Sequence, residues 1–244
     1  MKNQTLYYLF LMVWASSLMG ANGQDAPTDP GLTIQKRSVA AFNCLHVRSA
    51  MQVSIRDGSP DQIEFTCQNY VVPYVRIRVK DGELIVKLSR PIRRKGTRAV
   101  LVTLHNGNLT RIRAGQAASI ESDVPLQSDQ LAISLKGASG LAAPLTVNRL
   151  SVALEDASGA ALRGTTSGAF FNLTGASQLS AEGLSIANLN IHLLKASQAS
   201  VWVSDTLSAS AGGVSVLTYR GTPAVIAQST TQQAVVHAQH TANP

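Results

Sequence analysis

A motif of eleven residues occurs five times in this chain, and no other feature constrains the fold as strongly. The first copy, LAISLKGASGL, occupies residues 131–141, and related copies occupy residues 150–160, 169–179, 189–199 and 207–217. Successive copies start 19, 19, 20 and 18 residues apart. A repeat of this period is typical of a solenoid, whose units bury their apolar faces only by stacking on one another.

Each copy shows alternating apolar residues ahead of a corner of small residues. In the first copy Leu131, Ile133 and Leu135 precede a Gly-Ala-Ser corner, and the other copies keep this spacing. A period of two indicates a strand with one buried face. The alternation resumes out of phase at Leu141 and Ala143, so the chain must bend at the corner.

Such strands, stacked turn on turn, predict an all-β fold: a right-handed parallel β-helix (solenoid) of about six or seven turns with N-terminal β-hairpins. Equivalent residues of successive turns would lie about 4.8 Å apart along the axis. The right hand is favoured because left-handed β-helices carry a hexapeptide period, whereas here the apolar spacing is two and the turn length varies. An antiparallel sandwich competes, but it does not require similar sequence at each return.

Every corner ends in a serine, and the copies would place these serines in one outer or corner column. The column comprises Ser139, Ser158, Ser177, Ser197 and Ser215. We expect their hydroxyl groups to hydrogen-bond along the column, so their expected role is structural.

The repeat fades outward, which sets the expected domain limits. Residues 109–117 look like an earlier, degenerate turn, and residues 225–236 look like a last turn with a Thr-Gln-Gln corner. We expect a single β-helix domain over residues 36–236, with an irregular basic hairpin part at 36–108 and a repeat part at 109–236. Residues 24–35 are expected to be a flexible mature N-terminus and residues 237–244 a frayed tail.

Residues 1–23 have the pattern of a signal peptide. Lys2 gives a positive start, an apolar run extends from Leu6 to Ala15, and small residues at Ala21 and Gly23 precede the expected mature start. This pattern predicts export, to the periplasm, the outer-membrane surface or the exterior. The apolar run is too short to span a bilayer and no comparable run follows, so the mature chain is not expected to span a membrane.

Positive charge is concentrated in the first half of the mature chain. Residues 24–113 carry 15 Lys and Arg against 7 Asp and Glu, a balance of +8, whereas residues 114–244 carry 5 against 7, a balance of −2. The densest run contains Arg90, Arg93, Arg94, Lys95 and Arg98. This run either binds the anionic groups of an envelope polyanion or is a solvated connecting loop. It lacks interleaved aromatic residues, so no specific nucleic-acid partner is expected.

Two Asp-Gly pairs in this half predict β-hairpins. Strands at residues 51–56 and 63–67 flank Asp57-Gly58, and strands at residues 75–80 and 83–88 flank Asp81-Gly82. Asp-Gly between alternating segments favours a type I′ turn. In the second hairpin the residues at 76, 78 and 80 are basic and would form a cationic outer face.

Cys44 and Cys67 are the only cysteines of the chain. In an oxidising compartment a disulfide between them would close a loop of about 22 residues and stabilise the fold by roughly 3 kcal/mol. Their spacing matches no metal or redox motif, so the alternatives are a disulfide or two buried thiols.

The residues point to no catalytic, cofactor-binding or metal-binding site. The one adjacent acidic pair, Glu155-Asp156, would place its carboxylates on opposite faces of a strand, and the five histidines are scattered. No nucleophile-elbow, zinc-binding or phosphate-loop motif occurs. We therefore expect no enzyme.

The order of these features resembles that of a known family. The leader is followed by VAAFNCLHV at residues 39–47, a strand–Asp-Gly–strand unit, the tandem corners and LTYRGTP at residues 217–223. This order resembles the head GIN domain family, also called auto-transporter adhesins, of exported proteins in Bacteroidetes-type bacteria. The resemblance covers roughly residues 36–236, and it implies a β-helix similar to pectin lyase folds, a role in cell adhesion and no established catalytic residues. Asp156 and Lys195 depart from the pattern by replacing corner glycines.

The sequence thus predicts an exported, non-catalytic binding protein: an adhesin, or a module that binds a cell-surface glycan or another envelope polyanion. The alternative is a polysaccharide lyase or hydrolase on the same β-helix. A third interpretation is a periplasmic structural or sensory module whose coil ends pair with another chain, including a homo-oligomer.

Overall fold

The computed structural model describes residues 31–92 and 97–239. The expected signal peptide and the basic residues Arg93, Arg94 and Lys95 lie outside the described residues. Residues from Thr33 onward form one compact unit.

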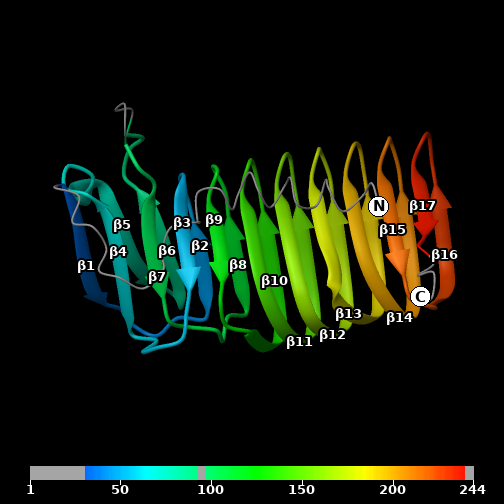
Figure 1. The fold of residues 1–244 in the computed structure, drawn as a ribbon, viewed down its shortest axis with the longest axis horizontal. Helices are drawn as coiled ribbons and strands as arrows, with labels where there is room; N and C mark the ends of the chain where they lie inside the picture. Colours follow the sequence, from blue (N-terminus) through cyan, green and yellow to red (C-terminus); the bar gives the residue numbers. More distant parts are fainter. Residues whose placement is uncertain (1–30, 93–96, 240–244) are drawn as a thin grey trace, which may run out of the picture. The chain divides into compact units, whose positions relative to one another are not determined.

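The described residues form 17 β-strands and one short 3-10 helix, η1 (Val72–Tyr74) (Figure 1). The strands are β1 (Leu32–Ser38), β2 (Cys44–Val47), β3 (Met51–Ile55), β4 (Gln62–Gln68), β5 (Val75–Lys80), β6 (Glu83–Leu88), β7 (Val100–Leu104), β8 (Arg111–Ala114), β9 (Ser119–Ser122), β10 (Leu126–Leu135), β11 (Gly140–Leu154), β12 (Gly159–Leu173), β13 (Gln178–Leu193), β14 (Gln198–Ala211), β15 (Val216–Arg220), β16 (Ala224–Thr230) and β17 (Val235–Ala238).

The repeat copies stack in register, which confirms the predicted β-helix. Leu135 of β10 pairs with Leu154 of β11, and the same column continues through Leu173, Leu193 and Ala211. The pairings from β10 to β17 are parallel. The result is a β-solenoid of about seven turns.

Each of the long strands β11 to β14 contributes to two successive turns. The start of β11 pairs with β9, whereas its second half pairs with β10. Between the two halves, the consecutive exposed residues Asn148 and Arg149 interrupt the alternation of buried side chains. The strand therefore runs along one wall of the coil, bends, and continues along the next wall.

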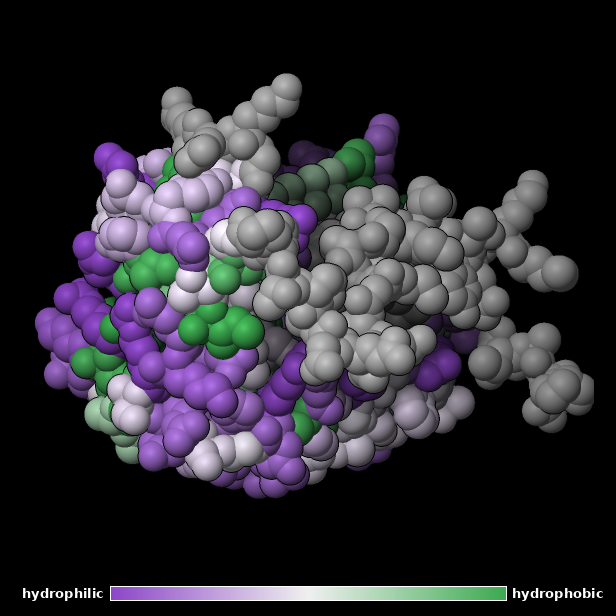
Figure 2. Space-filling model, turned by 60° about the vertical axis from the view of Figure 1, so that its left-hand side comes forward, coloured by the Kyte–Doolittle hydropathy of each residue, from purple (hydrophilic) through white to green (hydrophobic). Residues whose placement is uncertain are grey.

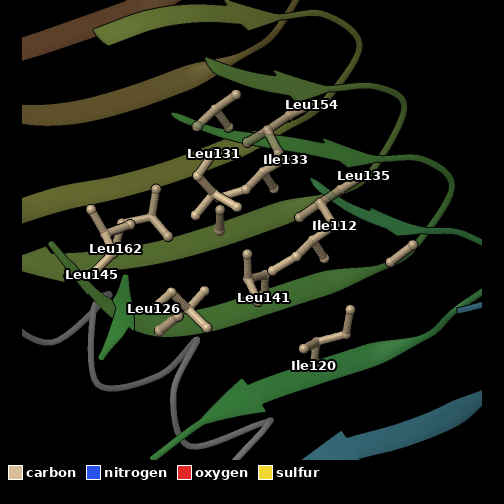
Figure 3. Packing of buried hydrophobic residues seen from close by; sticks show 14 of the residues in the cluster. Ile112, Ile120, Leu126, Leu131, Ile133, Leu135, Leu141, Leu145, Leu154 and Leu162 are labelled. Carbon is tan, nitrogen blue, oxygen red and sulfur yellow. The ribbon is translucent and has the colours of Figure 1, made fainter. Parts of the chain in front are cut away.

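The interior of the coil is filled by the apolar side chains that alternate along these strands. Figure 3 shows Leu131, Ile133 and Leu135 of β10 among side chains from neighbouring turns. All three are at most 2% exposed. Burial of a side chain of this size stabilises the fold by roughly 1.5–3 kcal/mol. Because a unit alone would leave this face in water, the stacking of turns is what makes the fold stable.

The corners also stack in single file. The amide of Ala176 donates to the carbonyl oxygen of Asp156 at 2.8 Å, and the amide of Ala196 donates to that of Gly175 at 2.9 Å. Asp156 and Lys195 have φ angles of 62° and 66°, close to the 68° of Gly137 in the first corner. The two non-glycine residues thus occupy glycine positions, as the sequence indicated.

The prediction that the corner serines hydrogen-bond to one another along their column is wrong. All five serines are buried rather than outward, and the hydroxyl groups of four donate to backbone carbonyl groups. Ser139 donates to Lys136 of its own corner at 2.8 Å, whereas Ser158 donates to Leu135 of the preceding turn at 3.2 Å. The carbonyl groups at each bend are nearer acceptors than a serine one strand spacing away, about 4.8 Å.

In the first half, the stacking order differs from the chain order. Strand β2 lies between β6 and β8, because Leu45 pairs with both Leu84 and Ile112. Strand β3 lies in the same way between β7 and β9. These pairings are parallel, so the turn made by β2 and β3 is enclosed by one turn from β6 and β7 and another from β8 and β9.

The second predicted hairpin is confirmed. Strands β5 and β6 pair antiparallel, and Lys80 lies opposite Glu83. Asp81 and Gly82 have φ angles of 51° and 71°, the positive values that a type I′ turn requires.

The first predicted hairpin is wrong. Strand β7 lies between β3 and β4, parallel to the first and antiparallel to the second, so Val102 pairs with both Val53 and Phe65. The glycine of Asp57-Gly58 is required here for a reason other than a hairpin turn. A β-carbon at Gly58 would lie 2.5 Å from Nδ1 of His105, so the glycine allows a close approach instead of a two-residue turn.

Strands β1, β4 and β5 lie at the N-terminal end of the stack, where β4 pairs antiparallel with β7, β5 pairs antiparallel with β6, and β1 pairs with β4. Figure 2 brings this end forward and shows a mostly hydrophilic surface with small, separate apolar patches. Such a cap suits an open stack, because an apolar edge would invite pairing with other chains.

The limits of the strands differ slightly from expectation. Strand β1 begins at Leu32, so residues 32–35 are extended strand, and β17 continues to Ala238. Among residues 31–92 and 97–239, no helix has the length and apolar character needed to cross a membrane.

Candidate ligand-binding groove

A groove with a volume of about 680 Å³ runs across β8 and β10 to β14, parallel to the stacking direction and beside the bend of the long strands. We call it the axial groove. It is lined by Thr110, Arg111, Gln130, Leu131, Ala132, Arg149, Leu150, Ser151, Gly168, Ala169, Phe170, Asn188, Leu189, Asn190, Thr206 and Ser208.

Two columns of side chains form the walls of the axial groove. The register places them as follows: the first column is Arg111, Ala132, Ser151, Phe170, Asn190 and Ser208, and the second is Gln130, Arg149, Gly168, Asn188 and Thr206. Between them lies an inward-facing column of buried apolar residues, such as Leu150 and Leu189. Because each wall residue sits one position before or after an inward residue, both walls face outward.

Phe170 is the exposed aromatic residue of the groove. It is 45% exposed, whereas its neighbour Phe171 on the same strand is fully buried. The preceding residue of its column is Ser151, and the second column has Gly168 on the same strand, where a β-carbon would meet nothing within 4 Å. Small neighbours therefore leave space around the ring. His192 lies beside it, with ring centroids 5.6 Å apart and planes tilted by 59°.

The second wall is held by hydrogen bonds between turns. Asp129 accepts from Nδ2 of Asn148 at 2.8 Å and from a guanidinium nitrogen of Arg149 at 3.1 Å. These two donors hold the pKa of Asp129 below its usual value. Two turns on, the hydroxyl group of Thr206 donates to Oδ1 of Asn188 at 2.6 Å. These hydrogen bonds within the protein therefore hold the polar groups of the wall in place before any ligand binds.

The first column continues beyond the groove into the basic half. Arg111 pairs with Cys44 of β2, and Cys44 pairs with Glu83 of β6. Glu83 lies 3.4 Å from Arg113 and 3.8 Å from Nδ1 of His46. The groove thus opens, at this end, onto a surface of mixed charge.

The surroundings of His46 favour its neutral form. Burial and the neighbouring Arg48 lower its pKa, and the opposing effect of Glu83 is smaller. Nε of Arg48 donates to Nε2 of His46 at 3.1 Å, which requires an unprotonated acceptor nitrogen.

The described ends of the predicted basic run are engaged with nearby residues. The guanidinium group of Arg90 stacks on the ring of Tyr74 at 4.1 Å and hydrogen-bonds its hydroxyl group. The amide of Arg98 donates to Oε1 of Gln68 at 3.1 Å. The basic residues of β5 are exposed, as predicted for a cationic outer face.

Cys44 and Cys67 are free cysteines in the structure. Cys67 is 1% exposed and faces the core, and burial raises its pKa. Cys44 is half-buried on the outward side of β2, where its sulfur lies 3.4 Å from Oδ1 of Asn43 and 3.8 Å from the hydroxyl group of Thr110. The two side chains therefore point to different sides of the coil wall.

The carboxylates of the acidic pair Glu155-Asp156, and that of Asp123, each have a partner of their own. Glu155 pairs with Lys136 at 2.9 Å, and Asp123 pairs with Arg56 at 3.2 Å. Asp156 accepts a hydrogen bond from the amide of Gly137 at 3.3 Å. Within the part of the chain that the structure describes, no three His, Cys, Asp or Glu side chains group into a metal-binding arrangement.

The sequence did not reveal the axial groove. One signal was present: Phe170 stands at an outward position where the other copies have Ala132, Ser151, Asn190 and Ser208. A bulky aromatic residue at an exposed repeat position is unusual, and the structure shows that it marks the groove.

Fold and groove together define a class of protein: a β-solenoid with an open groove along its axis. The sequence profile of a family described as “Putative auto-transporter adhesin, head GIN domain” matches residues 41–223. Because this match covers most of the chain, the protein belongs to that family, as the order of its sequence features indicated. Among curated proteins, none matches the chain.

Solved structures share the fold at low sequence identity. A structure described as a “putative adhesin” from Bacteroides fragilis has a TM-score of 0.76 at 17% identity, covering 86% of this chain and 97% of that chain. One described as a “putative lipid binding protein” from Parabacteroides distasonis has a TM-score of 0.71 at 14% identity, covering 87% and 98%. A “putative adhesin” from Parabacteroides merdae has a TM-score of 0.63 at 18% identity, covering 87% and 98%.

Proposed function

We propose that this protein is an exported, non-catalytic adhesin that binds an extended glycan of a cell surface along the axial groove. The observation that carries the proposal is the groove itself. It crosses six strands, β8 and β10 to β14, which corresponds to about 24 Å at five strand spacings. A ligand shaped as a chain fits such a site better than a compact metabolite does.

The chemistry of the walls supports a glycan. A sugar ring has an apolar face of C–H groups and an edge of hydroxyl groups. The exposed ring of Phe170 offers an aromatic face for the first, because aromatic faces carry negative partial charge and pack against C–H groups. Asn188, Asn190 and Ser208 offer donors and acceptors for the second.

Membership of a family named for adhesins and the leader pattern of residues 1–23 support export and a binding role. The arrangement of acidic groups supports a non-catalytic role. Glycosidases use a pair of carboxyl groups flanking the scissile bond. Asp129, beside the second wall, is already engaged by Asn148 and Arg149.

The basic residues Arg90, Arg93, Arg94, Lys95 and Arg98 have a second role in this proposal, which is electrostatic attraction to an anionic cell surface. The double variant Arg93→Ala with Arg94→Ala is expected to weaken binding at low salt more than at high salt. Binding unchanged at both salt concentrations would remove the run from the proposal.

A glycan array tests the groove. Gly168→Leu fills the space beside Phe170 without a backbone clash, and we expect it to abolish the binding that the unaltered protein shows. Thr165→Leu is the matched control: it lies on the same strand, is exposed, and does not line the groove. Equal loss in both variants, or no loss in Gly168→Leu, would contradict the proposal. Release of reducing ends from any bound polysaccharide would show an enzyme instead.

A further inference from the structure

One end of the axial groove carries an arginine that has no acidic partner among the residues that the structure describes. Arg111 lines the groove and is exposed, and no ion pair involves it among residues 31–92 and 97–239. The other arginine of the lining, Arg149, is paired with Asp129 at 3.1 Å. The positive charge available to a ligand is therefore localised at the Arg111 end.

Arg111 and Phe170 belong to the same column of the groove wall. The register runs from Arg111 through Ala132 and Ser151 to Phe170. Three strand spacings separate the two residues, which is about 14 Å along the axis. The intervening residues are small, so nothing in the column obstructs a ligand between the cation and the aromatic ring.

The net charge of the chain also becomes more positive toward the Arg111 end of the groove. Residues 24–113, which include β8, carry 15 Lys and Arg against 7 Asp and Glu, whereas residues 114–244 carry 5 against 7. A chain-shaped ligand in the groove thus meets a nearly neutral surface over β11 to β14 and the exposed guanidinium group of Arg111 at β8. This gradient favours one orientation of an acidic ligand.

We infer that the groove selects a linear acidic oligosaccharide, with one sugar ring packed on Phe170 and a carboxylate or sulfate group held by Arg111. The inference rests on the proposed function and adds the ligand class. Two N–H groups of a guanidinium match the oxygen edge of such an anion, and a neutral glycan would leave this cation unused. A single sugar does not reach both residues across about 14 Å.

Calorimetry with two matched pairs of hexasaccharides tests this. One pair is an oligogalacturonate and its fully methyl-esterified form, and the other is a sulfated carrageenan oligosaccharide and its desulfated form. The proteins are the unaltered chain, Arg111→Gln, Phe170→Ala and Arg163→Gln. Arg163 is an exposed arginine of β12 outside the groove, so its variant has the same net charge as Arg111→Gln.

We expect the unaltered chain to prefer the acidic member of at least one pair by about tenfold or more. Arg111→Gln should bind both members of that pair equally, whereas Arg163→Gln should keep the preference. Phe170→Ala should weaken both members by about tenfold without changing the preference. Which of the two pairs shows the preference identifies whether Arg111 binds a carboxylate or a sulfate group.

No preference in either pair, a preference that survives in Arg111→Gln, or an equal loss in Arg163→Gln would each overturn the inference. A neutral glycan that the unaltered chain binds as tightly as its acidic counterpart or more tightly, and that Gly168→Leu no longer binds, would overturn only the ligand class and leave the proposed function standing. Glycan binding that Gly168→Leu does not affect would overturn both.

Discussion

Gly164 of β12 lies directly against the backbone of Leu145 of β11. A β-carbon at residue 164 would overlap the carbonyl oxygen of Leu145 and come within 3.0 Å of its carbonyl carbon. Gly164 also has a φ angle of 116°, which residues with a side chain rarely adopt. We expect Gly164→Ala to lower the free energy of unfolding by roughly 3 kcal/mol or more.

Gly168→Ala, four residues further along β12, is the control for that variant. Its β-carbon would meet nothing within 4 Å, so we expect a change within about 0.5 kcal/mol. Urea denaturation followed by circular dichroism measures both. Similar stabilities for the two variants would show that adjacent turns are not packed as closely as described.

Phe170 and Phe171 should differ sharply in their contributions to stability. Phe171 is 0% exposed, and its truncation to Ala should cost roughly 3–5 kcal/mol through lost burial and a residual cavity. Phe170→Ala should cost less than about 1 kcal/mol because the ring is already exposed. Thermal denaturation distinguishes them, and a large loss in Phe170→Ala would assign that ring to the core instead of to a ligand.

Lys195→Gly should stabilise the protein by about 1 kcal/mol. Lys195 has a φ angle of 66°, and the left-handed conformation strains residues that carry a β-carbon. The equivalent residue of the next corner is Gly213, with a φ angle of 78°. Lys195→Ala removes the same charge but keeps the β-carbon, so it should not stabilise. A higher unfolding midpoint in the Ala variant than in the Gly variant would contradict the strain argument.

His46 should make the protein less stable in mild acid. Its folded pKa lies below the unfolded value of about 6.5, because burial and Arg48 disfavour the charged form. Below about pH 6.5 the unfolded chain therefore binds a proton that the folded chain does not, and the free energy of unfolding falls as pH decreases.

His46→Gln removes that titration, so its stability should decrease less than that of the unaltered protein between neutral and mildly acidic pH. Urea denaturation across the pH range gives the difference between the two curves, in which the contributions of shared groups largely cancel. Parallel curves, or a stability of the unaltered protein that rises on acidification relative to the variant, would contradict the described surroundings of His46.

The two thiols should differ in reactivity. Cys44 is half-buried on the outward side, whereas Cys67 is 1% exposed with a pKa raised by burial, and thiols react as thiolates. Under native conditions iodoacetamide should alkylate Cys44 first, and Cys67 should react only after denaturation. Peptide mass spectrometry identifies the labelled residue, and an intact mass lower by two hydrogens with no labelling would show a disulfide.

The stacked turns could be predicted because the repeat is periodic and its pattern involves residues close together in the sequence. Leu135, Leu154 and Leu173 form a stacked column because each occupies the same place relative to its corner, and any other register would bury polar residues. The second hairpin was readable for a similar reason, since Asp81-Gly82 alone specifies the turn. The first hairpin failed because Gly58 accommodates His105, a residue 47 positions away in the sequence.

The sequence by itself determined the coil: its period, its inward face and the positions of its corners follow from alternation and small residues, which act over a few neighbours along the chain. Only the tertiary structure decided that β6 and β7 stack outside β2 and β3, that corner serines bond to carbonyl groups, and that Arg111 and Phe170 share one groove wall. The physical reason is distance along the chain. The order in which separate strands pair depends on how the turns stack on one another. The same stacking decides which outward side chains lie together at a bend. Neither is determined by a pattern of neighbouring residues along the chain.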